Sequence, residues 1–161
     1  MTSAAAPSGR MFCTFRLDGR LFGFDVLDVK EVTPAAPTTR VPHAPDEVLG
    51  LVNIRGHIHL ALSIRRLLGM PPAAAAPDNR LVLFKPPVGE AFGVIVDEVS
   101  EIRAVEAARI EPFASAGREG PAPGRGHRDL IDCVCELDGE LLVVLDARRM
   151  LAAVETTFHA T

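Results

Sequence analysis

The chain has 161 residues, of which 48% are hydrophobic, and a formal net charge of −4, which favours a folded protein over a disordered one. The negative charge and the aromatic content, eight Phe with no Trp or Tyr, argue against a nucleic-acid partner, which needs clustered basic and stacking side chains. No apolar run approaches the roughly 20 residues that cross a bilayer and the N-terminus has no secretory signal, so the sequence predicts a cytoplasmic protein without direct membrane insertion, whose cysteines are reduced.

A β-hairpin is predicted at the start of the chain, after a disordered tail over residues 1–10. Residues 11–17 and 20–25 are apolar runs separated by Asp18-Gly19. An Asp-Gly pair between two such runs is typical of a tight hairpin turn, because both residue types tolerate positive φ.

A short valine-rich turn follows the hairpin. Residues 26–32 place their valines three apart, as one helical turn would. Residues 97–102 are predicted to form a second turn of this kind later in the chain. Between them, residues 47–55 and 57–64 are predicted strands that meet at Gly56, and a short helix over 65–69 is followed by a Pro- and Ala-rich linker.

The second half of the chain contains four more predicted strands, and a short helix is predicted over 147–154. Because residues 114–128 are rich in Gly and Pro, they are predicted to form an exposed flexible loop. Many short strands with almost no long helix favour a barrel or a sandwich over a parallel α/β sheet. The strands are expected at 81–84, 91–96, 130–137 and 140–145, the last two joined by Asp138-Gly139.

The sequence contains an internal repeat in two blocks. Residues 22–32 match residues 92–102, and residues 56–68 match residues 139–151, in the same order. Two matching blocks in order indicate two copies of one supersecondary unit. Since each copy is too small to bury a large core alone, the two are expected to share an apolar seam.

The order of these segments resembles the CheW-like chemotaxis coupling protein family over residues 11–152. The most specific part is the stretch Gly50-Leu51-Val52-Asn53-Ile54-Arg55-Gly56, which is similar to that family's signature strand and turn. The resemblance implies a mainly β fold of two five-stranded Src-homology-3-like barrels packed side by side, with short helices. The intertwined barrels are expected mainly over 22–70 and 80–145, with a C-terminal tail over 153–161.

The resemblance also implies a non-enzymatic adaptor. Family members couple the cytoplasmic tip of a methyl-accepting chemoreceptor to the regulatory domain of a histidine kinase, which has the same fold, in membrane-associated receptor arrays. The pathway could be flagellar chemotaxis, gliding, pili or another output. An apolar groove with one acidic rim residue is expected to bind the receptor tip, formed by Val26, Val29, Glu31, Val32, Val96 and Val99.

The signature turn has two interpretations. Asn53 and Arg55 are expected on one face of their strand, and the planar guanidinium of Arg55 can hold a carboxylate or backbone carbonyls. Arg55 could tie the turn to an acidic neighbour, or it could bind a partner. Gly50, Asn53, Arg55 and Gly56 are therefore predicted to be structural, partner-binding or both.

An alternative function is a metal- or small-molecule-binding β-barrel domain that uses His57 and His59, which share a strand face. Two ligands do not complete a site, so solvent-facing histidines are the favoured interpretation. Cys133 and Cys135 also share a face, and cysteines in a strand are usually small buried apolar residues. No nucleophile elbow or phosphate loop occurs, so no catalytic, cofactor-binding or metal residue is predicted.

Overall fold

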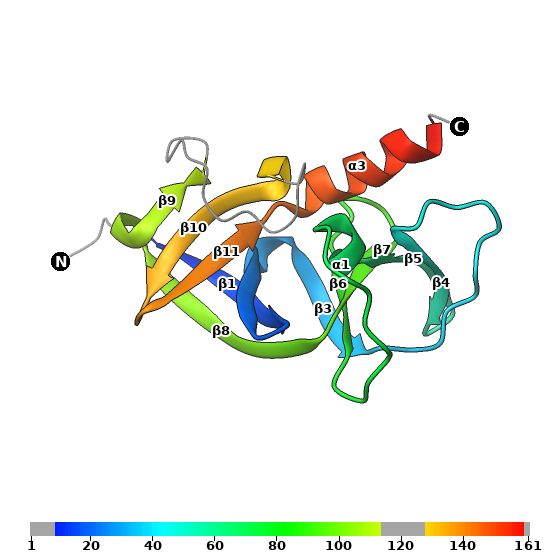
Figure 1. The fold of residues 1–161 in the computed structure, drawn as a ribbon, viewed down its shortest axis with the longest axis horizontal. Helices are drawn as coiled ribbons and strands as arrows, with labels where there is room; N and C mark the ends of the chain where they lie inside the picture. The colour runs from blue at the N-terminus through cyan, green and yellow to red at the C-terminus, as the bar shows by residue number, and fades with distance from the viewer. Residues whose placement is uncertain (1–8, 114–127, 160–161) are drawn as a thin grey trace.

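The computed structural model describes residues 9–113 and 128–159, and in this part the chain is mainly β with two mixed sheets and short helices (Figure 1). The first strand already begins at Gly9, because Gly9 and Arg10 pair with the long strand that ends at Glu106. The disordered tail predicted over 1–10 is therefore wrong at its last two residues. Its other residues, and the loop predicted over 114–128 except its last residue, lie outside the described residues.

The first sheet has six strands in the order β8-β1-β2-β11-β10-β9 and forms what we call the first barrel. All neighbours pair antiparallel except β2 and β11, which are parallel. The strand count exceeds the expected five because of the three-residue strand β9. The bounds are β1 (Gly9–Leu17), β2 (Arg20–Asp25), β8 (Glu98–Glu106), β9 (Ile110–Pro112), β10 (Ile131–Leu137) and β11 (Glu140–Leu145).

The second sheet has the five expected strands in the order β3-β6-β7-β5-β4 and forms the second barrel. Here β5 and β7 are the parallel pair. These strands are equivalent to β11 and β2 in the repeat, so the two sheets have the same design. The bounds are β3 (Val29–Pro34), β4 (Val48–Ile54), β5 (His57–Ser63), β6 (Arg80–Phe84) and β7 (Phe92–Val96).

The two sequence repeats exchange their opening hairpins. β1 and β2 come from the first repeat but join β8–β11, whereas β6 and β7 come from the second repeat but join β3–β5. The first barrel is thus built from strands within residues 9–25, 98–112 and 131–145, and the second from strands within residues 29–96. The division expected at 22–70 and 80–145 does not match this pairing, although the intertwining itself is present.

The two Asp-Gly turns form as predicted. Asp18 and Gly19 have φ of 53° and 79°, and Asp138 and Gly139 have φ of 46° and 82°. Positive φ at both central residues gives the turn a twist that matches that of the paired strands. Local turn chemistry therefore fixes β1–β2 and β10–β11.

The helical elements are short except at the C-terminal end. α3 continues to His159, so residues 153–159, which were predicted to belong to a C-terminal tail, are part of this helix. No helix in the described parts of the chain is both long enough and apolar enough to cross a membrane. The helical bounds are η1 (Val26–Asp28), α1 (Ile64–Leu67), η2 (Ala107–Arg109), η3 (Arg128–Leu130) and α3 (Ala147–His159).

The largest apolar cluster lies between the barrels, as the repeat predicts. Phe24 of β2 meets Phe84 of β6 edge to face, with ring centroids 4.8 Å apart. Phe15 stacks on Phe24 at 5.2 Å, and Phe92 stacks on Phe84 at 5.0 Å. This row of rings joins the two sheets through one seam core, and each barrel has a smaller cluster of its own.

Candidate interaction surface

The signature turn is a third tight hairpin turn, between β4 and β5. Arg55 and Gly56 occupy its two central positions with φ of 53° and 87°. The Gly56 N–H donates to Asn53 Oδ1 at 2.8 Å, which fixes the turn from within. Arg55 is therefore a turn residue, and the expectation that it shares a strand face with Asn53 is wrong.

Gly50 has a structural role in the same hairpin. Its φ is 145°, and a Cβ at this position would lie 2.3 Å from Thr39 O. Thr39 and Leu51 exchange two backbone hydrogen bonds of 2.8 Å right beside it. Only a glycine allows the preceding loop to approach β4 this closely.

Arg55 binds an acidic neighbour on β3. Its two terminal nitrogens donate to the two carboxylate oxygens of Glu31 at 2.7 and 3.2 Å. These hydrogen bonds lower the pKa of Glu31, and Lys30 and His59 act in the same direction. The Arg55 side chain is 69% exposed and that of Glu31 27%, so the pair lies on the surface.

The predicted valine groove does not form as one surface. Val96 is fully buried, and Val29 and Val99 pack against the seam core. Val32 is exposed, whereas Val26 is half-buried in η1. The helical turn ends at Asp28 and β3 begins at Val29. A bulge after Val29 then pairs Val29 with Phe84 and Val32 with Val82, so the two valines lie on one face of the strand but differ in burial.

A different apolar surface lies close by, which we call the β1–β8 patch and define as Met11, Leu27 and Ile102. These side chains are 50%, 73% and 57% exposed. Met11 pairs with Ala104 and Cys13 with Ile102, so Met11 and Ile102 are diagonal neighbours on one face. η1, which carries Leu27, contacts β1. Sequence reasoning missed this patch because it forms only when β8 crosses to pair with β1.

A second exposed apolar surface covers the β4–β5 hairpin. Leu51 and Asn53 point to the same side of β4, and Asn53 is paired with Ile58 of β5. Ile58 is 54% exposed. We call this surface the β4–β5 face and define it as Leu49, Leu51 and Ile58.

The two histidines do not assemble a metal site. His59 is buried, contrary to expectation, and its Nδ1 lies 3.2 Å from His57 O, whereas His57 is exposed. They line a hollow of about 280 Å³ with Glu31, but Arg55 already binds that carboxylate. Within residues 9–113 and 128–159, no group of three His, Cys, Asp or Glu residues could hold a metal ion.

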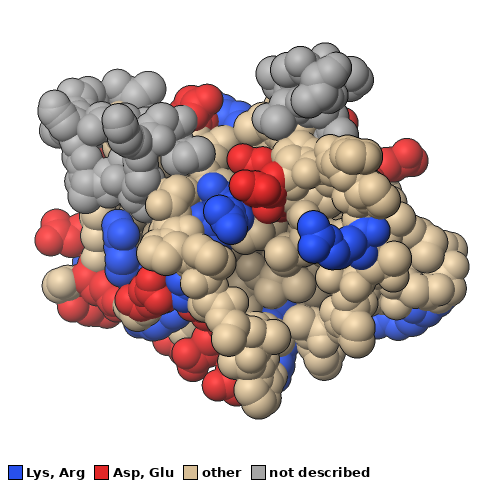
Figure 2. Space-filling view, turned by 45° about the vertical axis from the view of Figure 1, so that its right-hand side comes forward, with Lys and Arg blue, Asp and Glu red and all other residues tan. Residues whose placement is uncertain are grey.

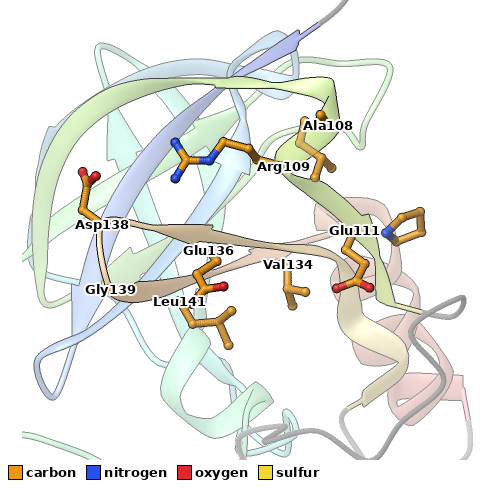
Figure 3. Close-up of a pocket in the computed structure, with 10 residues that line it drawn as sticks. Ala108, Arg109, Glu111, Val134, Glu136, Asp138, Gly139 and Leu141 are labelled. Atoms are coloured by element: carbon orange, nitrogen blue, oxygen red, sulfur yellow. The ribbon is translucent and has the colours of Figure 1, made fainter.

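The first barrel has a larger hollow, of about 710 Å³, over β9, β10 and β11 (Figure 3). Glu111, Glu136 and Asp138 line it, and the Arg109 side chain extends toward the Asp138 end. In Figure 2, Asp and Glu side chains gather on the side of the first barrel, at the left of the view. This hollow therefore presents a mainly acidic wall.

Comparison with known proteins identifies the family. The model of the CheW-like domain matches residues 11–155. The chain belongs to the CheW-like domain family. It is 35% identical over 116 residues to the chemotaxis protein CheW of Rhizobium meliloti, covering 70% of this chain and 74% of that protein. It is 28% identical over 155 residues to the chemotaxis protein CheW of Klebsiella aerogenes, covering 94% and 87%.

A solved CheW structure has the same fold. The scaffolding protein TtCheW from Thermoanaerobacter tengcongensis superposes with a TM-score of 0.72 at 24% identity, covering 85% of this chain and 88% of that structure. This likeness supports the two-barrel architecture. The signature turn and the two apolar surfaces thus lie within a CheW-like domain.

Proposed function

We propose that this CheW-like protein is a non-enzymatic adaptor that couples the cytoplasmic tip of a chemoreceptor to the regulatory domain of a histidine kinase, in the cytoplasm at membrane-associated receptor arrays. The observation that carries the proposal is the presence of two separate exposed apolar surfaces on one β scaffold. An adaptor must hold two partners at once, and exposed apolar side chains gathered together mark interaction sites.

The β1–β8 patch suits the receptor tip. Its residues stand on η1, β1 and β8, where the chain passes from the first barrel to the second. A helical hairpin tip can lay an apolar stripe along such a surface. Of the valines expected in the groove, half-buried Val26 lies next to Leu27 and belongs with this surface.

The β4–β5 face suits the kinase domain. Leu49, Leu51 and Ile58 stand on two paired strands and are all exposed. A barrel of the same fold can offer a similar face in return. Two such apolar sheet faces can pack against one another as sheets do within a protein.

Arg55 lies near the rim of the β4–β5 face, in a backbone conformation of positive φ that is unfavourable for arginine. The other two tight turns have Asp at this position, a residue that tolerates positive φ better than Arg does. The position therefore favours the arginine side chain for its chemistry rather than its conformation. Among the described residues only two of its five donors are bonded, both to Glu31, so the others can bind a partner.

The test uses matched apolar-to-acidic variants in binding assays with a receptor-tip fragment and with the kinase regulatory domain. Ile102→Asp should lose the receptor fragment and retain the kinase domain, and Ile58→Asp should do the reverse. Leu141→Asp changes an exposed leucine outside both surfaces and should retain both partners. If neither Ile102→Asp nor Ile58→Asp loses a partner, the assignment of the surfaces is wrong.

The metal-binding alternative makes a separate prediction. If His57 and His59 held a metal, the purified protein would contain one equivalent that is lost in His57→Ala. The buried position of His59 and the pairing of Glu31 with Arg55 do not support such a site.

A further inference from the structure

One arginine ties three strands of the first barrel together. Arg10 of β1 donates from Nε and Nη2 to Asp25 Oδ2 at 3.1 and 3.0 Å, and from Nη2 to Asp132 Oδ2 at 2.9 Å. Asp25 is the last residue of β2, and Asp132 lies on β10. The guanidinium also lies over the Phe12 ring, 5.1 Å from its centroid. These contacts from three directions fix the position of the Arg10 side chain.

The second oxygen of the Asp25 carboxylate holds η1. Asp25 is the N-cap of this helical turn, and its Oδ1 accepts a hydrogen bond from the Leu27 N–H at 2.8 Å. Asp is among the preferred N-caps because its short side chain reaches an amide two residues further on. The two oxygens thus have separate tasks. Oδ2 meets Arg10, which orients the carboxylate, and Oδ1 meets the backbone of η1.

The other contacts of η1 are at its far end. η1 has three residues and none of them is buried, so no side chain anchors it in a core. The Lys85 N–H donates to Asp28 O at 3.0 Å, and Arg148 Nη1 lies 3.4 Å from Asp28 Oδ1. Both contacts hold the last residue of η1. The start of η1 therefore depends on the Asp25 cap.

The second repeat shows what happens without such a cap. Ile95 stands at the position equivalent to Asp25, since residues 22–32 match residues 92–102. An isoleucine side chain offers no oxygen to a backbone amide. There β7 ends at Val96 and β8 begins at Glu98, with no helical turn between these two described strands. The helical turn thus accompanies the carboxylate.

η1 determines where one residue of the β1–β8 patch stands. Met11 and Ile102 lie on paired strands, so the hydrogen-bonded ladder places them. Leu27 lies on η1, and its side chain is exposed rather than packed in a core. The backbone of η1 therefore sets the position of Leu27.

We infer that Arg10 is a positioning residue for receptor binding, which acts through Asp25 to orient η1 and place Leu27 in the β1–β8 patch. Without Arg10, the Asp25 carboxylate loses its paired cation. Because only 17% of the Asp25 side chain is exposed, the unpaired carboxylate gains by turning toward water. That rotation releases the Leu27 N–H and the start of η1. The inference rests on the proposed assignment of the β1–β8 patch to the receptor.

The first measurement is amide hydrogen exchange at Leu27, which requires no partner. Exchange should accelerate in Arg10→Met and in Asp25→Ala, because one frees the cap to rotate and the other removes it. Arg16→Met is the matched control, since Arg16 lies at the other end of β1, is 33% exposed against 35% for Arg10, and pairs with Glu140. It should leave exchange at Leu27 as in the wild-type protein. Unchanged exchange in Arg10→Met would overturn the inference.

The second measurement is affinity for the receptor-tip fragment in a double-mutant cycle. Arg10→Met and Asp25→Ala should each weaken it about fivefold, the factor that corresponds to the loss of one N-cap. The double variant should bind no more weakly than either single variant, because both changes remove the same contact. Affinity for the kinase regulatory domain should be unchanged in all three, which a general loss of folding would not allow.

Direct contact between Arg10 and the receptor is the competing explanation, because Arg10 borders a hollow beside Met11. It predicts that Asp25→Ala, which keeps the guanidinium, binds the receptor fragment normally while Arg10→Met does not. That result would overturn the inference.

Ile102→Asp separates failure of this inference from failure of the proposed function. If Ile102→Asp loses the receptor fragment while Arg10→Met binds it as the wild-type protein does, the inference is overturned and the adaptor proposal stands. If Ile102→Asp retains the fragment, the assignment of the patch is wrong and the inference fails with it.

Discussion

Arg55 and Glu31 form a two-pronged ion pair that links the β4–β5 turn to β3, with hydrogen bonds of 2.7 and 3.2 Å. The pair joins two elements at opposite edges of the second sheet, whose order is β3-β6-β7-β5-β4. It therefore closes the second barrel on its exposed side. The ion pair shows that Arg55 ties the turn to an acidic neighbour, which is the first of its two interpretations. Partner binding by Arg55 stays a prediction.

Arg55→Asn should separate the two roles. Asn tolerates positive φ at least as well as Arg, so the turn should form and the melting temperature should stay close to that of the wild-type protein. Binding to the kinase domain or the receptor fragment should weaken, because the free guanidinium donors are gone. Thermal melts and binding assays on one preparation distinguish the structural role from the binding role. Glu31→Gln is the matched control, because it removes the ion pair and keeps the guanidinium. Unchanged binding by Arg55→Asn would remove this residue from the interaction surface.

A more buried ion pair ties the barrels together. Arg65 of α1 donates to Asp97 at 3.0 Å and to Asp18 at 2.7 Å, and its side chain is 11% exposed. Arg65→Met should lower the free energy of unfolding by about 2 kcal/mol, because Asp18 and Asp97 lose their charged donor and Asp97 keeps only the hydrogen bond from the Asp18 N–H. Arg148 is the equivalent residue in the repeat. Its side chain is exposed, and its contact with the Asp28 carboxylate is longer, at 3.4 Å. Arg148→Met should change stability by less than about 0.5 kcal/mol, as denaturant titration would measure.

The same pair predicts a pH dependence. Burial raises the pKa of Asp97, but the hydrogen bonds from Arg65 and from the Asp18 N–H outweigh it, so the pKa is lowered. The ionised carboxylate therefore stabilises the fold above the ordinary Asp pKa of about 3.9. That contribution is lost as the pH falls through the lower folded-state value. The stability difference between the wild-type protein and Asp97→Asn should accordingly be full at neutral pH and shrink in acid. A constant difference down to pH values below the ordinary Asp pKa would contradict this account.

Local chemistry explains what could be predicted from the sequence. The Asp18-Gly19 and Asp138-Gly139 turns need only their own two residues, and the repeat indicated the shared seam that Phe24 and Phe84 form. The exchange of hairpins could not be predicted, because a strand's apolar pattern does not say which sheet it joins. The valine spacing failed for a related reason, since a spacing of three fits a helical turn until β3 begins at Val29.

Val29 and Val32 differ in burial, which separates the predicted valine groove from the surface that the structure shows. Val29 is half-buried against the seam core, so Val29→Asp should destabilise the fold by about 2 kcal/mol, since it places a charge in a partly apolar setting. Val32 is exposed, and Val32→Asp should cost no more than about 1 kcal/mol, the span of β-propensity. Loss of receptor binding in Val29→Asp would then reflect unfolding. Calorimetry on both variants checks the difference, and equal stability of the two variants would contradict the packing of Val29 against the seam core.

The glycines of the signature hairpin differ in what they tolerate. Gly56 has φ of 87° but no atom within 4 Å of an added Cβ, so Gly56→Ala should cost only the conformational penalty of about 1–2 kcal/mol. At Gly50 the added Cβ would meet Thr39 O at 2.3 Å, and relief requires the loop carrying Thr39 to move off β4. Gly50→Ala should therefore cost clearly more and should expose the Thr39 and Leu51 amides, which now bond each other's carbonyls. Hydrogen exchange at these two amides is the specific measurement. Exchange that accelerates in Gly50→Ala and not in Gly56→Ala would confirm that Gly50 is required by close approach, and equal exchange in both would show that backbone conformation alone accounts for the two glycines.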